Sequence, residues 1–163
     1  MRFKLVAAAI ALGVAAMPSI ASAQVDTKKF GPWAYIKTDK SCAALYSQGS
    51  QTLFMLAGAD SSGITITTDS SRRAKEDSEH KILMIFGTKE TSREGNITAA
   101  KITGDAVSYF LPYKAEILGE LLKLDPRFYG EENGVRVWGF EPPAADTQQA
   151  MNAFIACQKS FAG

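Results

Sequence analysis

The sequence predicts a mainly β (α+β) domain: an antiparallel meander or sandwich with a short helix near 115–124 and a C-terminal helix near 147–161 packed on it. Between Phe30 and Phe110, apolar and polar residues alternate in short runs, which is the period-two pattern of strands. In the two later segments, apolar residues instead recur three or four positions apart, which is the spacing of a helix.

The alternation is clearest where Ile64 and Ile66 are separated by Thr65. Gly, Asn, Asp and Ser, the residues that tight turns favour, separate one run from the next. The runs that we expect to form strands are 33–37, 43–47, 52–56, 63–67, 81–86, 97–102 and 107–111.

The segment 115–124 carries apolar residues at helical spacing, and Asp125-Pro126 follows it directly. Proline cannot continue a helix, so we expect the helix to end there. Further on, Asn133-Gly134 lies between two apolar runs and favours a two-residue hairpin turn. Two more strands are therefore expected, around 128–129 and at 135–140.

In the last segment, Asp146 and Gln149 have the spacing of a capping box, which predicts that the final helix opens there. On that helix Ala150, Phe154 and Cys157 fall on one face, so the cysteine points toward the core. An even cysteine count in an oxidising compartment indicates a disulfide, here Cys42 with Cys157. The alternative is two free thiols, one of them a nucleophile activated by the only histidine, His80.

The first residues have the pattern of a secretory signal peptide. Arg2 and Lys4 precede an apolar run over 5–16, and Ala21-Ser22-Ala23 is a small-x-small cleavage site. The run is about a dozen residues, whereas a permanent membrane helix needs about 20. We therefore expect 1–23 to be removed, leaving 24–163 as a single exported globular domain, periplasmic or secreted, with no stable membrane span. The alternative is a helix that stays part of the fold.

Charge and chemistry exclude several classes of function. Without Arg2 and Lys4, 16 basic residues stand against 17 acidic ones, and nucleic-acid binding needs a basic surplus. One histidine and no paired-cysteine spacing predict no metal site, no cofactor and no catalytic group. The adjacent Glu131 and Glu132 are the only acid pair that we weigh for a cell-wall hydrolase, which needs two carboxylates flanking the scissile bond.

Two regions could bind a partner. Aromatic residues concentrate in the C-terminal half, and Tyr113, Tyr129 and Trp138 are the candidates for an exposed binding platform, the alternative being that they belong to the core. The dense polar run from Asp69 to Asp77 is typical of an exposed loop and could contact a partner.

Phe30-Gly31-Pro32-Trp33, followed by Cys42 and Ala43-Ala44-Leu45-Tyr46, resembles the opening of small exported bacterial proteins of the invasion-associated locus B type. The later Gly139-Phe140 and the helix residues Ala150, Phe154 and Ile155 are similar to that family's closing segment. The resemblance implies a β-rich periplasmic domain without established catalytic residues.

We therefore expect a non-enzymatic exported envelope domain that binds a protein or a cell-envelope component. A secreted inhibitor or chaperone-like adaptor, docking an enzyme through the loop from Asp69 to Asp77, is the first alternative. A cell-wall hydrolase is the second.

Overall fold

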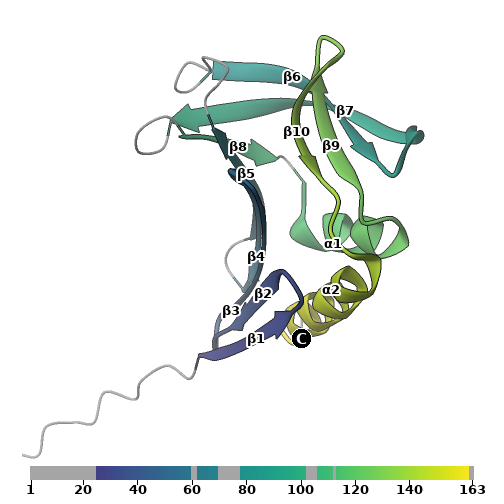
Figure 1. Cartoon of the computed structure of the whole chain (residues 1–163). Coiled ribbons are helices and arrows are strands. Elements are labelled where there is room, and N and C mark those ends of the chain that lie inside the picture. The colour runs from purple at the N-terminus through teal and green to yellow at the C-terminus, as the bar shows by residue number, and fades with distance from the viewer. Residues whose placement is uncertain (1–24, 60–61, 70–77, 102–105, 112, 162–163) are drawn as a thin grey trace, which may run out of the picture.

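The computed structural model describes residues 25–59, 62–69, 78–101, 106–111 and 113–161. Within these ranges, ten strands form one antiparallel sheet, and two helices pack against it (Figure 1). The predicted mainly β class, with a short helix and a C-terminal helix, is confirmed. The predicted signal peptide, its cleavage site and Gln24 lie outside the described residues.

The sheet has the strand order β1-β2-β3-β4-β5-β8-β7-β6-β9-β10, so most neighbours in space are also neighbours in sequence. The strands are β1 (Asp26–Phe30), β2 (Trp33–Lys37), β3 (Ser41–Gln48), β4 (Gln51–Gly58), β5 (Ser62–Asp69), β6 (Ser78–Phe86), β7 (Thr88–Lys101), β8 (Ala106–Leu111), β9 (Phe128–Glu132) and β10 (Val135–Phe140). The helices are α1 (Ala115–Leu124) and α2 (Ala144–Lys159).

Burial along the strands follows the predicted period of two. Leu53 and Met55 of β4 are buried, and they pair with Ile66 and Ile64 of β5, which are also buried. The intervening residues point to the opposite face, because successive side chains of a strand alternate. One face of the sheet therefore forms the core.

Two strands differ from the prediction. The edge strand β1 was not predicted because four of its five residues are exposed, so the sequence shows no apolar alternation. Strand β7 begins at Thr88 rather than near Ile97, since the polar stretch before Ile97 pairs with β6. In both cases the strand forms through backbone hydrogen bonds to a neighbouring strand. The pattern of apolar residues in the sequence does not reveal these bonds.

The predictions around α1 and the hairpin are confirmed. Helix α1 ends at Leu124, and the backbone N–H of Asp125 donates to the carbonyl of Leu121 at 3.1 Å. Asn133 and Gly134 have φ values of 51° and 73°, so both central residues of the turn adopt the left-handed conformation that a two-residue hairpin needs.

Helix α2 begins at Ala144, three residues earlier than predicted, and the capping-box prediction was wrong. Asp146 lies within the first turn, and the residue before the helix is Pro143. The side chain of Thr147 lies inward: its hydroxyl donates to the Pro143 carbonyl at 2.8 Å and accepts from the indole Nε1–H of Trp33 at 3.0 Å. This last bond joins the start of α2 to β2.

Replacing Thr147 by valine should lower the free energy of unfolding by about 1–3 kcal/mol, because the buried Trp33 Nε1–H loses its acceptor. Urea unfolding measures the change. Thr147→Ser keeps a hydroxyl and is the matched control. A loss in Thr147→Ser with none in Thr147→Val would show that the methyl group, not the hydrogen bond, matters at this position.

The sheet curves so strongly that its last strand returns to the turn between β3 and β4. Gln51 accepts a hydrogen bond from the backbone N–H of Gly139 at 2.9 Å, and Gln48 accepts one from that of Glu141 at 3.2 Å. The rings of Tyr46 and Phe140 meet edge to face. Figure 1 shows α1 and α2 on the concave side of the curve, where the core lies.

Tyrosine ionisation should destabilise the protein in alkaline solution. Burial raises the pKa of Tyr129, as does its hydrogen bond to Glu141, which is 2.6 Å long. A pKa raised in the folded state means that this stabilisation is complete below the ordinary value of 10.0 and is lost as the pH rises through the folded value. The urea unfolding midpoint of the wild type should fall as the pH rises from below 10.0 to above the raised pKa of Tyr129, and that of Tyr129→Phe should fall less. Equal falls in the two proteins would show that Tyr129 is not the group responsible.

Candidate functional site

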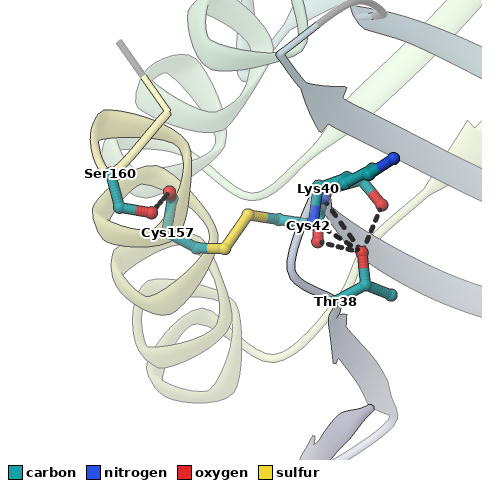
Figure 2. The surroundings of a disulfide bond; sticks show 6 residues. Thr38, Lys40, Cys42, Cys157 and Ser160 are labelled. Atoms are coloured by element: carbon teal, nitrogen blue, oxygen red, sulfur yellow. Dashed lines mark hydrogen bonds between the residues drawn. A yellow bond between two sulfur atoms is a disulfide. The ribbon is translucent and has the colours of Figure 1, made fainter. Parts of the chain in front are cut away.

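The predicted disulfide is present and joins β3 to α2. Cys42 and Cys157 are 115 positions apart in sequence, and their Cα atoms lie 6.3 Å apart (Figure 2). Both are buried, and among the described residues no cysteine is left as a free thiol, so the alternative of a cysteine nucleophile is wrong. The bond is consistent with an extracellular or periplasmic location.

The turn before Cys42 is held by Thr38. Its Oγ1 accepts hydrogen bonds from the backbone N–H groups of Lys40 at 3.2 Å and Ser41 at 3.0 Å. Figure 2 shows Thr38 and Lys40 beside the disulfide. This fixes the start of β3 and, through the disulfide, the C-terminal half of α2.

A groove of about 450 Å³ lies between the disulfide-tethered helix α2 and helix α1. The exposed surface of its lining is almost entirely apolar, although Glu116, Glu120, Gln158 and Lys159 are among the lining residues. Helix α1 contributes Glu116, Ile117, Glu120, Leu121 and Leu124, and α2 contributes Ile155, Gln158 and Lys159.

Helix α1 presents a second apolar stripe to this groove. Its first stripe, which includes Leu118 and Leu122, is buried in the core. The second stripe consists of Ile117, Leu121 and Leu124 at positions i, i+4 and i+7, and here Ile117 is 50% exposed and Leu124 is 86% exposed. An apolar side chain as exposed as Leu124 gains nothing from the folded monomer, so the stripe is suited to a binding partner.

Close packing of the helices shapes the groove floor. Gly119 of α1 is buried, and a Cβ added to it would stand 3.4 Å from the side chain of Ile155 on α2. The absent side chain lets the two helices approach each other, and the largely buried Ile155 forms the floor. The apolar spacing of 115–124 predicted the helix but not its division into two stripes, so the groove was not predicted.

The rim charges differ between the two sides of the groove. Glu116 and Glu120 lie on the α1 side, and Glu120 pairs with Lys123 at 3.2 Å. Lys159 lies on the α2 side. A ligand therefore meets acidic groups along one helix and a basic group at the end of the other.

A smaller apolar pocket of about 130 Å³ lies on the sheet side of α1. It shares Ile117 and Leu121 with the groove and reaches Phe86 and Leu111 of the sheet. Tyr113, one of the three aromatic residues predicted for a platform, lines this pocket.

The other two predicted platform residues lie elsewhere. Trp138 is 1% exposed and packs in the core 5.1 Å from the ring of Tyr109, and within the described ranges its Nε1–H has no hydrogen-bond partner. Tyr129 is also largely buried, under the guanidinium of Arg136. The structure thus does not bring Tyr113, Tyr129 and Trp138 together on one exposed surface.

The acid pair weighed for hydrolysis is divided between two faces of β9. Glu132 binds His80, with 2.9 Å between Oε1 and Nδ1, on the face that carries the core. Glu131 is the next residue, so it points to the other face, where it lines a shallow pocket with Lys81. Within the residues that the structure describes, no three His, Cys, Asp or Glu side chains gather in a way that could hold a metal ion.

The polar loop predicted as a partner contact is described only at its first residue. Asp69 accepts a hydrogen bond from the hydroxyl of Ser50 at 3.0 Å. The remainder, 70–77, lies outside the described residues.

Comparison with protein-family models, with curated proteins and with solved structures found no match. In the described part of the chain, neither helix has the length and apolar character needed to cross a bilayer. The interpretation of the groove between α1 and α2 therefore rests on the residues and geometry of this chain.

Proposed function

We propose that this protein is an exported, non-enzymatic binding domain of the cell envelope, and that the groove between α1 and α2 holds an apolar helical segment of a partner protein. The observation that carries the proposal is the stripe Ile117, Leu121 and Leu124 on the wall of an apolar groove, in which Ile117 and Leu124 are exposed and Leu121 is partly buried. Fully burying an exposed leucine side chain stabilises a complex by about 1.5–3 kcal/mol, so Leu124 is the residue of the stripe that would contribute most to anchoring a ligand.

The form of the groove favours a helix as the ligand. The stripe has the spacing i, i+4 and i+7, and helices pack by interlocking side-chain ridges of that spacing. Helix α1 has 10 residues and is therefore about 15 Å long, enough for about three turns of a partner helix. Peptide helices commonly bind in this way, with their apolar face laid into a hydrophobic groove.

The rim charges favour one orientation of that helix. Basic side chains beside the partner's apolar stripe would face Glu116 and Glu120, and an acidic side chain would face Lys159. Such charges at the rim contribute mainly to specificity and to the rate of association.

Export and location belong to the same proposal. The signal-peptide pattern of 1–23 and the buried disulfide support an envelope compartment with oxidising conditions. The resemblance to exported proteins of the invasion-associated locus B type supports the same assignment.

A synthetic amphipathic peptide tests the proposal. The probe carries leucine at i, i+3, i+4 and i+7 with lysines along one side, and fluorescence anisotropy measures its binding. We expect Leu124→Ser to weaken binding about tenfold to a hundredfold, because one anchoring contact worth about 1.5–3 kcal/mol is lost. Leu124 is so exposed that the substitution should leave the unfolding midpoint unchanged.

The matched control is Val135→Ser, which removes an exposed apolar side chain at the β9–β10 turn, away from the groove lining. A scrambled peptide of equal composition controls for nonspecific adhesion. The proposal fails if the striped and scrambled peptides bind equally, or if Leu124→Ser and Val135→Ser have the same effect.

A further inference from the structure

The small pocket between α1 and the sheet has the size and the lining of a site for one aromatic ring. Its volume is about 130 Å³, and its inner wall consists of the buried side chains Ile64, Phe86, Leu111 and Leu118. In the described part of the chain, every side chain that lines it is hydrocarbon apart from the hydroxyl of Tyr113. A protein cavity of about 150 Å³ lined by Leu, Ile and Phe stays dry and binds benzene, so a pocket of this kind suits a single ring.

Hydrogen bonds at both ends of α1 keep this pocket open. The backbone N–H of Ala115, the first residue of α1, donates to the Oγ of Ser62 in β5 at 3.3 Å. Just after α1, the carbonyl of Arg127 accepts from the backbone N–H of Gly87, between β6 and β7, at 2.9 Å. Helix α1 is therefore held between two points on the sheet, which opposes a shift of the helix that would close the pocket.

The pocket adjoins the groove between α1 and α2. Ile117 and Leu121 line both, and Ile117 is 50% exposed. A helix that lies along the stripe Ile117, Leu121 and Leu124 therefore passes the pocket at the distance of one of its own side chains. The side chain of the partner helix that faces this part of α1 is the natural occupant.

Phe86 favours an aromatic occupant. Its ring stacks on that of Phe128, with centroids 4.8 Å apart and planes 9° apart, and Phe128 is fully buried. The ring of Phe86 is thus held in place where it lines the pocket, and Tyr113 contributes a second ring. Rings that meet edge to face or offset attract one another beyond the effect of the area they bury.

We propose that this pocket binds one aromatic ring, the side chain of a phenylalanine on the helix held in the groove. A charged or amide side chain would lose its water there without gaining hydrogen bonds, and a leucine would fill the pocket without the ring contacts. The inference rests on the proposed function for the source of the ring. Binding of a ring in the pocket can be measured without any peptide.

Toluene, which has the structure of the phenylalanine side chain, is the probe for the pocket alone. NMR of the disulfide-bonded protein, with labelled methyl groups, should show saturable toluene shifts at Ile64, Leu111 and Leu118. Leu111→Phe places a ring of the protein's own in the pocket and should weaken toluene binding at least about tenfold, because the volume is then filled. Toluene that shifts none of these methyl groups overturns the proposal.

Two further variants keep this test decisive. Ile64 is the cross-strand partner of Leu111, so Ile64→Phe fills the pocket from the neighbouring strand, with Leu118 as its readout. Val135→Phe adds the same ring at an exposed turn residue, and it should bind toluene like the wild type. Circular dichroism verifies that the variants are folded. Equal toluene affinity in the filled variants and in Val135→Phe contradicts the proposal.

A peptide series tests whether the ring comes from the bound helix. Phenylalanine replaces one stripe leucine at a time in the leucine-striped peptide, and fluorescence anisotropy compares each product with the parent. One of the products should bind about two- to tenfold more tightly, because its ring contacts Phe86 and Tyr113. Leu111→Phe should abolish this preference. Leu124→Ser, which lies outside the pocket lining, should weaken every peptide and keep the preference.

The two measurements separate this inference from the proposed function. If toluene binds and no striped peptide does, the groove proposal fails and the pocket stands as a site for an aromatic ring. If the peptides bind with no preference for phenylalanine, or with a preference that persists in Leu111→Phe, the inference fails and the groove proposal stands.

Discussion

Replacing Cys42 and Cys157 together by alanine lowers the free energy of unfolding by about 2–5 kcal/mol. The disulfide closes a loop of 115 positions, for which the loss of chain entropy in the unfolded state is worth up to about 5 kcal/mol. Chemical denaturation followed by circular dichroism measures the loss. The reduced and alkylated wild type should show a similar loss, and a loss below about 1 kcal/mol would contradict this role of the bond.

The same double variant should also weaken the groove. Ile155, Gln158 and Lys159 flank Cys157 and form the α2 side of the groove, so the tether of α2 to β3 sets the distance between its walls. We expect weaker binding of the striped peptide under conditions in which the variant is still folded. Unchanged binding would show that packing alone positions α2.

Replacing Gly130 by alanine should destabilise the protein by about 3 kcal/mol or more. The indole of Trp138 lies against Gly130, its cross-strand partner, and an added Cβ would overlap the indole ring. Trp138 is buried and in contact with Tyr109 and Phe128, so it has no free space into which to move. Urea unfolding measures the cost.

Gly63→Ala in β5 is the matched control. Gly63 lies in a strand with ordinary backbone geometry, and a Cβ added there would meet no atom within 4 Å. Its unfolding free energy should change by less than about 1 kcal/mol. Similar losses in the two variants would mean that the clash with Trp138 is not the cause.

Local signals in the sequence were sufficient for the elements that local chemistry determines. The bounds of α1 follow from its apolar spacing and Pro126, and the β9–β10 turn follows from Asn133-Gly134. The start of α2 was misplaced because Asp146 has the chemistry of a cap but lies inside the first turn, where Thr147 bonds to both Pro143 and Trp33. That arrangement depends on a residue 114 positions away.

The groove was not predicted because periodicity cannot tell one wide buried face from two stripes with different surroundings. Leu118 and Leu122 face the core while Ile117 and Leu124 face solvent, and only the position of α2 and the sheet decides between them. The same applies to Trp138, which the sequence allowed on a platform and the curvature of the sheet buries. Tertiary packing sets both outcomes.

Amide NMR of the labelled protein, titrated with the leucine-striped peptide, tests the central claim most directly. If the groove binds an apolar helix, the shifts should concentrate on α1 and the last turn of α2, with the largest changes near Ile117, Leu124 and Lys159. Shifts centred away from these two helices, or no shifts at a large molar excess of peptide, would contradict the account.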